Sequence, residues 1–365
     1  MTPDARLFDL VQLRLDRLVD ERASILLTIA EDTAPIARFS RQFLRGGKRF
    51  RATFCWEGWR AVAEEDRPGW EAAADGVVTV ASALEVFHAA ALVHDDLIDS
   101  SDTRRGAPSA HRRFEEVSRE NGYAGDAEGF GRAAAILLGD LLQSWSDDLF
   151  TEGVRALPVP AAAEARAEFE QMRLDVTAGQ FLDLVEERAW PNVPQEDALL
   201  RAQRVILYKS AKYSVEAPLI IGASLGGASL AQVASLRDFA LPLGIAFQLR
   251  DDLLGVFGDP SVTGKPAGDD LVEGKRTVLI ALARQEMAPG PRKLLDELLG
   301  DPDLDAEQIA LLQATLRESG AEARVETMIE ENVRAARIAL EEAPINDNAR
   351  DRLDLLIEPV TRRAS

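Results

Sequence analysis

A long apolar stretch without proline, Gly76 to Asp99, limits the possible folds of this chain more than any other feature. Its apolar residues are continuous instead of alternating with polar ones, which favours a buried helix over a half-exposed strand. Asp75 stands directly before it as a candidate N-cap. A second apolar stretch runs from Ala231 to Phe257, and alanine and leucine are abundant throughout. These features predict an all-α protein.

The chain has 365 residues, 46% of them hydrophobic, so it can bury a sizeable core. Short loops rich in glycine and proline separate the helical stretches, and no shift in composition divides the sequence. We therefore expect one domain, residues 1–365, built as a single large helical bundle. The one cysteine, Cys55, excludes an intramolecular disulfide and is typical of a reducing compartment.

The chain is strongly acidic: 42 Lys and Arg against 62 Asp and Glu give a net charge of −20. Such a surface repels nucleic acid and anionic lipid. The first residues carry mixed charges at helical spacing, unlike a signal peptide. Apolar runs such as residues 215–225 are too short to span a bilayer. We expect a cytoplasmic protein that binds no nucleic acid and has no stable membrane insertion.

Three carboxylates close the first apolar stretch. Asp95 and Asp99 are four residues apart and share a helix face, whereas Asp96 lies roughly 100° around the axis. Carboxylates at the end of an apolar helix cost free energy unless a cation neutralises them. Magnesium suits such a site, because it binds one or two carboxylates and keeps positions for water and phosphate oxygens. For this motif alone, a solvated acidic helix end is an equal alternative.

Basic residues follow these carboxylates, and the same order recurs later in the chain. Arg104 and Arg105 come within two turns, and guanidinium groups bind phosphate oxygens in a bidentate way. A second acidic pair, Asp251-Asp252, again lies late in an apolar helix, and Lys265 and Lys275 follow it. Acidic residues for a metal beside basic residues for a phosphate predict a metal–diphosphate site.

A third basic cluster, residues 46–51, reads Gly-Gly-Lys-Arg-Phe-Arg. Glycine lets a backbone approach a ligand closely, so Lys48 and Arg51 are candidates for anion binding. His88 lies seven residues before Asp95, on nearly the same helical face. The alternatives are a solvated helix start for the cluster and a packed core position for His88.

Together these motifs resemble those of the trans-isoprenyl diphosphate synthases, also called polyprenyl synthetases. The resemblance runs from Gly46 to about Thr277, most of the chain. The segments that carry it are, in chain order, Gly46 to Arg51, His94 to Gly106, Gly179-Gln180 with Asp183, Tyr208-Lys209-Ser210, Phe247 to Asp252, and Gly264-Lys265-Pro266.

The resemblance implies a fold, a cofactor and substrates. The fold is a helical bundle of the isoprenoid synthase type around a deep central cavity, usually in a homodimer. The cofactor is Mg²⁺, and the substrates are isopentenyl diphosphate and an allylic prenyl diphosphate. The magnesium ligands implied are Asp95, Asp99 and Asp251.

The remaining roles are also carried over from the family. Residues expected to hold the allylic diphosphate are Arg104, Lys209, Gln248 and Lys265. Residues expected to hold isopentenyl diphosphate are Lys48, Arg51, His88 and Arg105. Asp96 and Asp252 are expected to take part in catalysis, and Ser210 and Lys275 in substrate binding. His94 is expected to be structural, and His111 has no assigned role.

Two positions depart from the family pattern. Gly255 stands where the family often has a third aspartate, which weakens the case for three ligands in the second acidic motif. Asp259, eight residues after Asp251, is a candidate replacement. Ser210 stands where the family usually has threonine; the hydroxyl is kept, so we expect little effect.

The reaction implied is an electrophilic alkylation of an alkene. Cations stabilise the departing diphosphate, the allylic C–O bond ionises, and the alkene of isopentenyl diphosphate attacks the allylic cation. Product length is expected to depend on the helix that carries Asp95. Ala91 and Ala90 are small, and Phe87 is the first bulky ring upstream, roughly 12 Å along the helix. We therefore expect geranylgeranyl diphosphate (C20), with C15 or C25 as neighbouring possibilities.

Two other functions fit parts of the pattern. A class I terpene cyclase also uses an aspartate-rich helix and magnesium, but it lacks the second diphosphate site that Lys48, Arg51 and His88 would supply. A non-catalytic subunit of a heteromeric synthase would be expected to lose carboxylates, whereas both acidic motifs are present here.

Overall fold

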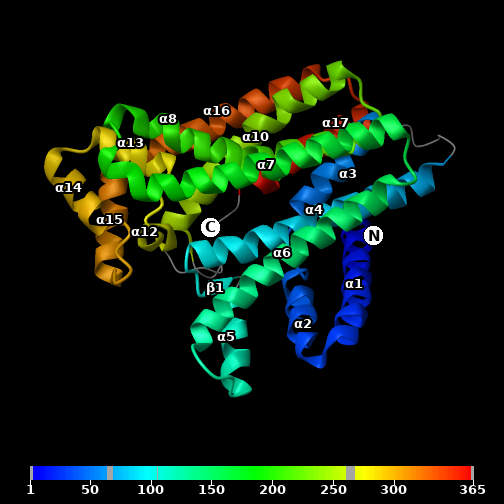
Figure 1. Ribbon diagram of the computed structural model, residues 1–365. Helices are drawn as coiled ribbons and strands as arrows, with labels where there is room; N and C mark the ends of the chain where they lie inside the picture. Colours follow the sequence, from blue (N-terminus) through cyan, green and yellow to red (C-terminus); the bar gives the residue numbers. More distant parts are fainter. Residues whose placement is uncertain (1–2, 64–68, 105, 260–267, 363–365) are drawn as a thin grey trace. The chain divides into compact units, whose positions relative to one another are not determined.

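A computed structural model describes residues 3–63, 69–104, 106–259 and 268–362 of the chain. Helices make up almost all of this part, which confirms the all-α prediction (Figure 1). Within these ranges the strands are β1 (Thr103–Arg104) and β2 (Ala107–Pro108), which form one short antiparallel pair. Two predicted site residues, Arg105 and Lys265, lie outside the described residues.

The described chain divides into two compact units. Unit 1 contains Met1–Glu164 and Gly222–Gly227, and unit 2 contains Ala165–Ile221 and Ala228–Ser365. A single domain over residues 1–365 stays a prediction. The helices of unit 1 are α1 (Pro3–Ile29), η1 (Glu31–Thr33), α2 (Ala34–Phe43), α3 (Phe50–Val62), α4 (Trp70–Ile98), α5 (Ala110–Glu120) and α6 (Ala127–Val154).

Two helices belong in part to each unit: α7 (Val159–Ala189) and α9 (Ala217–Leu225). The other helices of unit 2 are η2 (Trp190–Asn192), α8 (Gln195–Val205), the π-helix η3 (Ile206–Glu216), α10 (Leu230–Phe257), α12 (Asp269–Glu273), α13 (Val278–Glu286), α14 (Pro289–Leu298), α15 (Ala306–Glu318), α16 (Ala321–Glu342) and α17 (Asp347–Thr361).

Helix α4 is the buried centre of unit 1, and it packs along α6 (Figure 1). It begins at Trp70, after Gly69 with φ 90°, so the expectation that Asp75 caps the helix was wrong. Gly76 and Gly153 bring the two backbones together, because a Cβ on Gly76 would lie 2.6 Å from the Gly153 oxygen. Most of the apolar residues that follow are buried, and this burial stabilises the helix.

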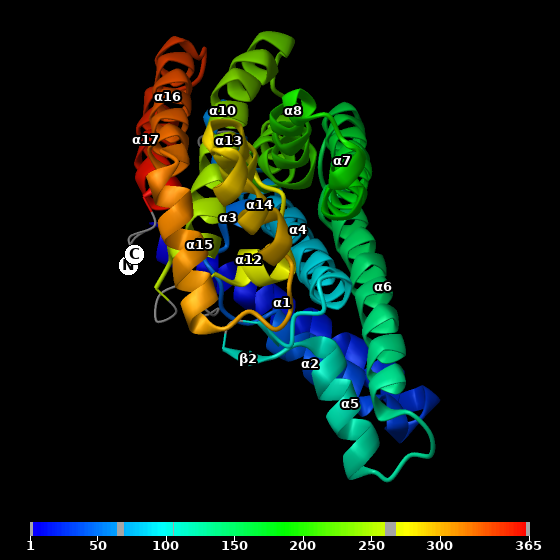
Figure 2. The ribbon, with the colours of Figure 1, turned by 90° about the vertical axis from the view of Figure 1, so that its left-hand side faces the viewer.

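Helix α10 has the equivalent place in unit 2. Its first turn is closed by a capping box, in which the Ser229 hydroxyl accepts from the Gln232 N–H and the Gln232 side chain accepts from Ser229 N–H. The helix packs against α16 and η3 (Figure 2). Leu249, Leu253 and Val256 bury its inner face in the core of the unit. The second acidic motif therefore projects from a part of the helix that is anchored in the core.

Two described helices, α4 and α10, are long and apolar enough by length and composition to cross a membrane. The expectation that every apolar run is too short for a span was therefore wrong on length. In α4, 83% of the most apolar window is buried inside the protein, as in the core helix of a globular fold, and in α10 the share is 33%.

Candidate active site

The first acidic motif occupies the end of α4. The helix ends at Ile98, and Asp99 is its C-cap, with its N–H donating to the Asp95 carbonyl at 2.9 Å. The backbone carbonyls at a helix C-terminus carry a partial negative charge. Carboxylates on this last turn therefore add to that charge, and the site favours a cation.

Arg104 supplies positive charge to this motif from strand β1. Its Nε donates to Asp96 Oδ1 at 2.7 Å, and its Nη2 lies 3.4 Å from Asp95 Oδ2. The Asp96 side chain is fully buried, whereas 24% of the Asp95 side chain is exposed. Asp96 is thus the inner partner of an arginine, and Asp95 faces outward. This arrangement fits the prediction that Asp95 and Asp99, and not Asp96, are the metal ligands.

Asp102 anchors the segment of chain that follows Arg104. Its carboxylate accepts from Arg112 Nε at 2.6 Å, and its carbonyl accepts from the Ser109 N–H at 2.9 Å. His111, which had no predicted role, is buried beside Ser109, with 3.2 Å between its Nδ1 and the hydroxyl. Burial lowers the pKa of His111. We read His111 as part of the support of the hairpin that carries Arg104.

His94 packs onto α6, as expected for a structural residue. Its Nε2 lies 3.3 Å from the Ile136 carbonyl oxygen, and its Nδ1 lies 3.5 Å from Gln143 Nε2. Gly139 makes room for the ring, since a Cβ there would lie 2.1 Å from His94 Nε2. This contact fixes the rotation of α4 immediately before Asp95.

The loop before α3 has an unusual backbone. Gly46, Gly47 and Arg49 all have positive φ, at 70°, 82° and 53°. Glycine adopts this conformation without strain, but arginine does not. Three hydrogen bonds offset the backbone strain at Arg49: its guanidinium donates to Glu85, to Gln12 at 2.8 Å and to the Leu44 carbonyl. Arg49 is therefore a buried anchor, and its neighbour Lys48 stays exposed.

Glu85 connects this loop to α4. Its carboxylate accepts from Arg49 at 3.2 Å and from the Ala52 N–H at 3.1 Å, in the first turn of α3. Glu85 lies three residues before His88, on the same face of α4. The contact therefore holds the start of α3, with Lys48 and Arg51, against the part of α4 that carries His88.

Glu85 was missed in the sequence. The available signal was its isolation, since it is the only carboxylate between Val77 and His94. A single buried charge in such an apolar run costs free energy unless another side chain pairs with it.

Lys209 and Ser210 lie in the π-helix η3, a rare geometry that often marks functional sites. Gly179 of α7 lets η3 come close, since a Cβ there would lie 2.3 Å from the Lys209 nitrogen. Lys209 Nζ then donates to Asp183 Oδ2 at 2.5 Å, one turn further along α7. One turn the other way, Asp175 accepts from Lys212 at 3.0 Å.

Lys275 joins the same acidic group. Its Nζ lies 3.4 Å from Asp183 Oδ2 and 3.1 Å from Glu187 Oε1. The structure thus brings two predicted substrate-binding lysines, Lys209 and Lys275, to one aspartate. Asp183 was noted only as part of a motif, and Glu187 was missed; their spacing of four residues on one helix face was the available signal.

The second acidic motif has an inner and an outer carboxylate too. Asp252 is 5% exposed and accepts from Gln248 Nε2 at 2.7 Å, while Gln248 Oε1 accepts from the Ser210 hydroxyl. Burial raises the pKa of Asp252 to about 7, against the hydrogen bond from Gln248, which lowers it. Asp251 is exposed on α10.

The space at Gly255 is filled by another acidic residue. A Cβ on Gly255 would lie 2.0 Å from Asp270 Oδ2, so the Asp270 carboxylate of α12 lies where a side chain at 255 would begin. Position 255 follows Asp251 by four residues and shares its helix face. The chain therefore places a carboxylate there from another helix. Asp259, the candidate replacement, is exposed at the end of α10.

The residues expected to limit product length lie on α4 before Asp95. Phe87 is 4% exposed, Ala90 is fully buried, and Ala91 is partly exposed. Phe87, Ala91 and Asp95 are spaced by four, so they form one line along the helix. That this line is the floor of a product cavity stays a prediction.

The donor chemistry of both motifs suits magnesium, which prefers carboxylate oxygens. Within residues 3–63, 69–104, 106–259 and 268–362, no three His, Cys, Asp or Glu side chains form a group that could hold a metal ion. Asp95 and Asp99 lie together in unit 1, and Asp251 lies in unit 2.

Comparisons of this chain with known proteins agree on one family. The sequence profile of the polyprenyl synthetases matches residues 34–316. A short chain isoprenyl diphosphate synthase of Methanothermobacter thermautotrophicus is 31% identical over 321 residues, 87% of each chain. A geranylfarnesyl diphosphate synthase of Aeropyrum pernix is 30% identical over 87% of this chain and 91% of its own.

A solved structure agrees with these sequence matches. The geranylgeranyl pyrophosphate synthase of Corynebacterium glutamicum, complexed with isoprenyl diphosphate and magnesium, is similar with a TM-score of 0.90 and 37% identity. The match covers 98% of this chain and 99% of that one. The resemblance drawn from the motifs is thus confirmed, and the chain belongs to the polyprenyl synthetase family of trans-prenyltransferases.

Proposed function

We propose that the chain condenses isopentenyl diphosphate with an allylic prenyl diphosphate and releases an all-trans short-chain prenyl diphosphate. The observation that carries the proposal is the match along nearly the whole chain to a synthase complexed with isoprenyl diphosphate and magnesium. The terpene cyclase and the non-catalytic subunit are not favoured, because the relatives are isoprenyl diphosphate synthases and both acidic motifs are intact.

The metal in this proposal is Mg²⁺, with Asp95, Asp99 and Asp251 as its ligands. When bound, the metal supplies positive charge that stabilises a departing diphosphate. The oxygen-only set of outward carboxylates supports this assignment. Arg104, Lys209, Gln248 and Lys265 hold the allylic diphosphate and bear its charge as the C–O bond breaks.

The second substrate is held at the start of α3. Lys48, Arg51, His88 and Arg105 bind the diphosphate of isopentenyl diphosphate and orient its alkene toward the allylic carbon. Once the allylic C–O bond has ionised, the alkene attacks the allylic cation and forms the new C–C bond. The proton that leaves the resulting cation goes to the released diphosphate, so no nucleophilic side chain is needed. Apolar walls exclude water, which would otherwise quench the cation.

Geranylgeranyl diphosphate (C20) is the proposed product. Small residues at 90 and 91 leave room for the growing chain, and the ring of Phe87 limits it. Purified protein with isopentenyl diphosphate and dimethylallyl, geranyl or farnesyl diphosphate should give mainly C20 by chromatography. Products of C15 alone, or of C30 and longer alone, would overturn this length. Phe87→Ala should lengthen the product, and an unchanged distribution would place the limit elsewhere.

The test of the reaction itself is magnesium-dependent release of diphosphate by the isolated chain. Release is expected only when isopentenyl and allylic diphosphates are both present. A cyclase would release diphosphate from the allylic substrate alone, and a non-catalytic subunit would release none without a partner.

A homodimer in the cytoplasm is the proposed form of the protein. Large apolar side chains are exposed on α6, where Ile136 and Leu137 are 47% and 61% exposed, and on α7, where Leu174 and Phe181 are 64% and 65% exposed. Apolar side chains of this size gather at subunit interfaces. Light scattering should give twice the mass of 39.9 kDa, and Leu137→Glu should shift it toward the monomer.

A further inference from the structure

The segment between α12 and α13 carries two adjacent basic residues with different partners. Lys275 binds the carboxylates of Asp183 and Glu187, near the C-terminal end of α7. Arg276, the next residue, lies over the ring of Trp190, with 3.9 Å between the guanidinium carbon and the ring centroid. Trp190 comes three residues after Glu187. Both side chains of the segment are therefore attached to the same short part of the chain.

Arg276 is held tightly. Its side chain is 7% exposed, and its Nη1 lies 3.4 Å from Asp296 Oδ1 of α14. Arg284 of α13 contacts the same ring at 5.2 Å and donates to Asp296 Oδ2 at 3.1 Å. Two arginines thus share one carboxylate and one indole. Guanidinium groups stack on aromatic faces in this way, whereas the ammonium of lysine has no planar surface to stack.

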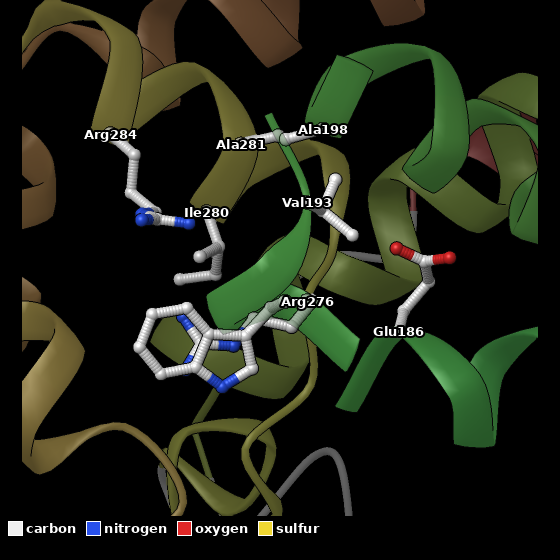
Figure 3. A pocket seen from close by; sticks show the side chains of 8 residues that line it. Glu186, Val193, Ala198, Arg276, Ile280, Ala281 and Arg284 are labelled. Atoms are coloured by element: carbon white, nitrogen blue, oxygen red, sulfur yellow. The ribbon is translucent and has the colours of Figure 1, made fainter. Parts of the chain in front are cut away.

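Next to this cluster is a pocket of about 350 Å³, including the open space at its mouth, lined also by Glu186, Val193 and Ile280 (Figure 3). The enclosed part of this space is only about 20 Å³, room for about one water molecule and far less than a ligand pocket needs. The Asp296 carboxylate already accepts from both Arg276 and Arg284, and Arg201 binds Glu186 at 2.6 Å. The charged side chains that line the pocket therefore already have partners inside the protein, which favours a supporting role over ligand binding.

The residue that this cluster supports is the neighbouring Lys275. Lysine has a long flexible side chain, so the three carboxylates around its tip do not fix where its backbone lies. The Lys275 N–H donates to the Asp270 carbonyl at 3.0 Å, which holds this backbone on the side of α12. The stack of Arg276 on Trp190 fixes the backbone one residue away. We propose that Trp190 and Arg276 are positioning residues for Lys275 and set the affinity for a substrate diphosphate. This inference rests on the proposed function, in which Lys275 binds substrate.

The first test separates positioning from stability. Trp190→Ala and Arg276→Ala should raise KM for the allylic diphosphate about tenfold, as expected when one charge-assisted contact of about 1.4 kcal/mol is lost, while kcat changes less. Trp190→Phe keeps an aromatic face and should stay close to the parent protein. Arg276→Lys keeps the charge without the stack and should behave like Arg276→Ala; it also serves if the alanine variants fail to fold.

Arg284→Ala is the matched control, because Arg284 shares the ring and Asp296 but is eight residues away from Arg276. It should lower Tm to a similar extent and leave KM within about twofold. Equal KM shifts in Arg284→Ala, or unchanged KM in both Trp190→Ala and Arg276→Ala, would overturn the proposal.

The second test uses Lys275 itself. If Trp190 acts through Lys275, Trp190→Ala should add no further increase in KM to a Lys275→Ala protein, whereas an independent effect would add fully. Calorimetry with inorganic diphosphate provides the same comparison without turnover. If the parent protein has no prenyltransferase activity, the proposed function fails, yet the diphosphate affinities of the same variants still decide the role of Trp190.

Discussion

The two acidic pairs, Asp95-Asp96 and Asp251-Asp252, occupy similar places late in apolar helices but have different surroundings. In each pair the first carboxylate is the more exposed and the second is buried. In unit 1 the buried Asp96 is paired with the guanidinium of Arg104. In unit 2 the buried Asp252 is hydrogen-bonded to the neutral amide of Gln248.

This difference shows how one sequence pattern produces two kinds of site. A salt bridge keeps a buried carboxylate ionised, at the expense of burying two charges that depend on each other. A neutral amide gives little compensation, and burial then raises the pKa of Asp252 to about 7. In the proposed function the outer carboxylates have the same role in both pairs, metal binding, whereas the inner carboxylates have different partners.

The largest effect is expected at the outer carboxylates. Asp95→Ala and Asp251→Ala should each lower kcat about a thousandfold, because a metal site contributes several kcal/mol to stabilising the leaving group. Both proteins should stay folded, since these side chains are at least partly exposed. Steady-state kinetics measures the loss of kcat, and calorimetric titration with Mg²⁺ measures the loss of metal affinity. If only one variant loses metal affinity, the outer positions are not equivalent.

The inner carboxylates should separate the two sites by stability. Asp96→Asn removes the charge that balances Arg104 in a buried pair and should lower the free energy of unfolding by about 3 kcal/mol or more. Asp252→Asn replaces a carboxyl with an amide of the same shape beside Gln248 and should cost within about 1 kcal/mol.

Urea unfolding of both proteins without added metal gives this comparison. Asp140→Asn is a suitable control, since its carboxylate is 62% exposed on α6. Equal losses for Asp96→Asn and Asp252→Asn would mean that the salt bridge and the amide contact support the two sites to the same degree.

Position 255 allows a sharper test of the second site. Gly255→Asp would restore the more usual family residue, but its Cβ would meet Asp270 and its charge would face another carboxylate. We expect a loss of about 1–3 kcal/mol on unfolding, typical of overpacking. Combining Gly255→Asp with Asp270→Gly should recover most of it, and a double-mutant cycle measures the coupling. Additive losses would show that the two positions do not share one space.

Much of this architecture could be predicted from the sequence, for identifiable reasons. The continuous apolar runs of α4 and α10 predicted the fold class, and the acidic and basic motifs indicated the family. The sequence could not show which carboxylate of each pair is buried, because that depends on Arg104 and Gln248 folding onto them. Nor could it show that Arg49 is a buried anchor while Lys48 is exposed, since this follows from the positive φ at Arg49 and from its contact with Glu85.

Long-range partners explain the remaining differences. Gly255 looked like a missing ligand, yet the structure fills its place from Asp270, fifteen residues later in the sequence. The stack of Arg276 on Trp190 joins η2 to the segment between α12 and α13, which lies far along the chain and carries no local signal. Contacts of this kind depend on how helices pack, and no local pattern of residues encodes them.

The smallest expected effect concerns Ser210, whose hydroxyl donates to Gln248 and so supports Asp252 indirectly. Ser210→Ala leaves the Gln248 oxygen without this donor and should cost about 1 kcal/mol in the free energy of unfolding. Ser210→Thr keeps the hydroxyl and introduces the usual family residue, so it should stay near the parent protein. The same change has no counterpart at the first site, where Arg104 binds Asp96 directly. If Ser210→Ala is as stable as Ser210→Thr, the amide of Gln248 is oriented by other contacts, and the second site is more rigid than its hydrogen bonds suggest.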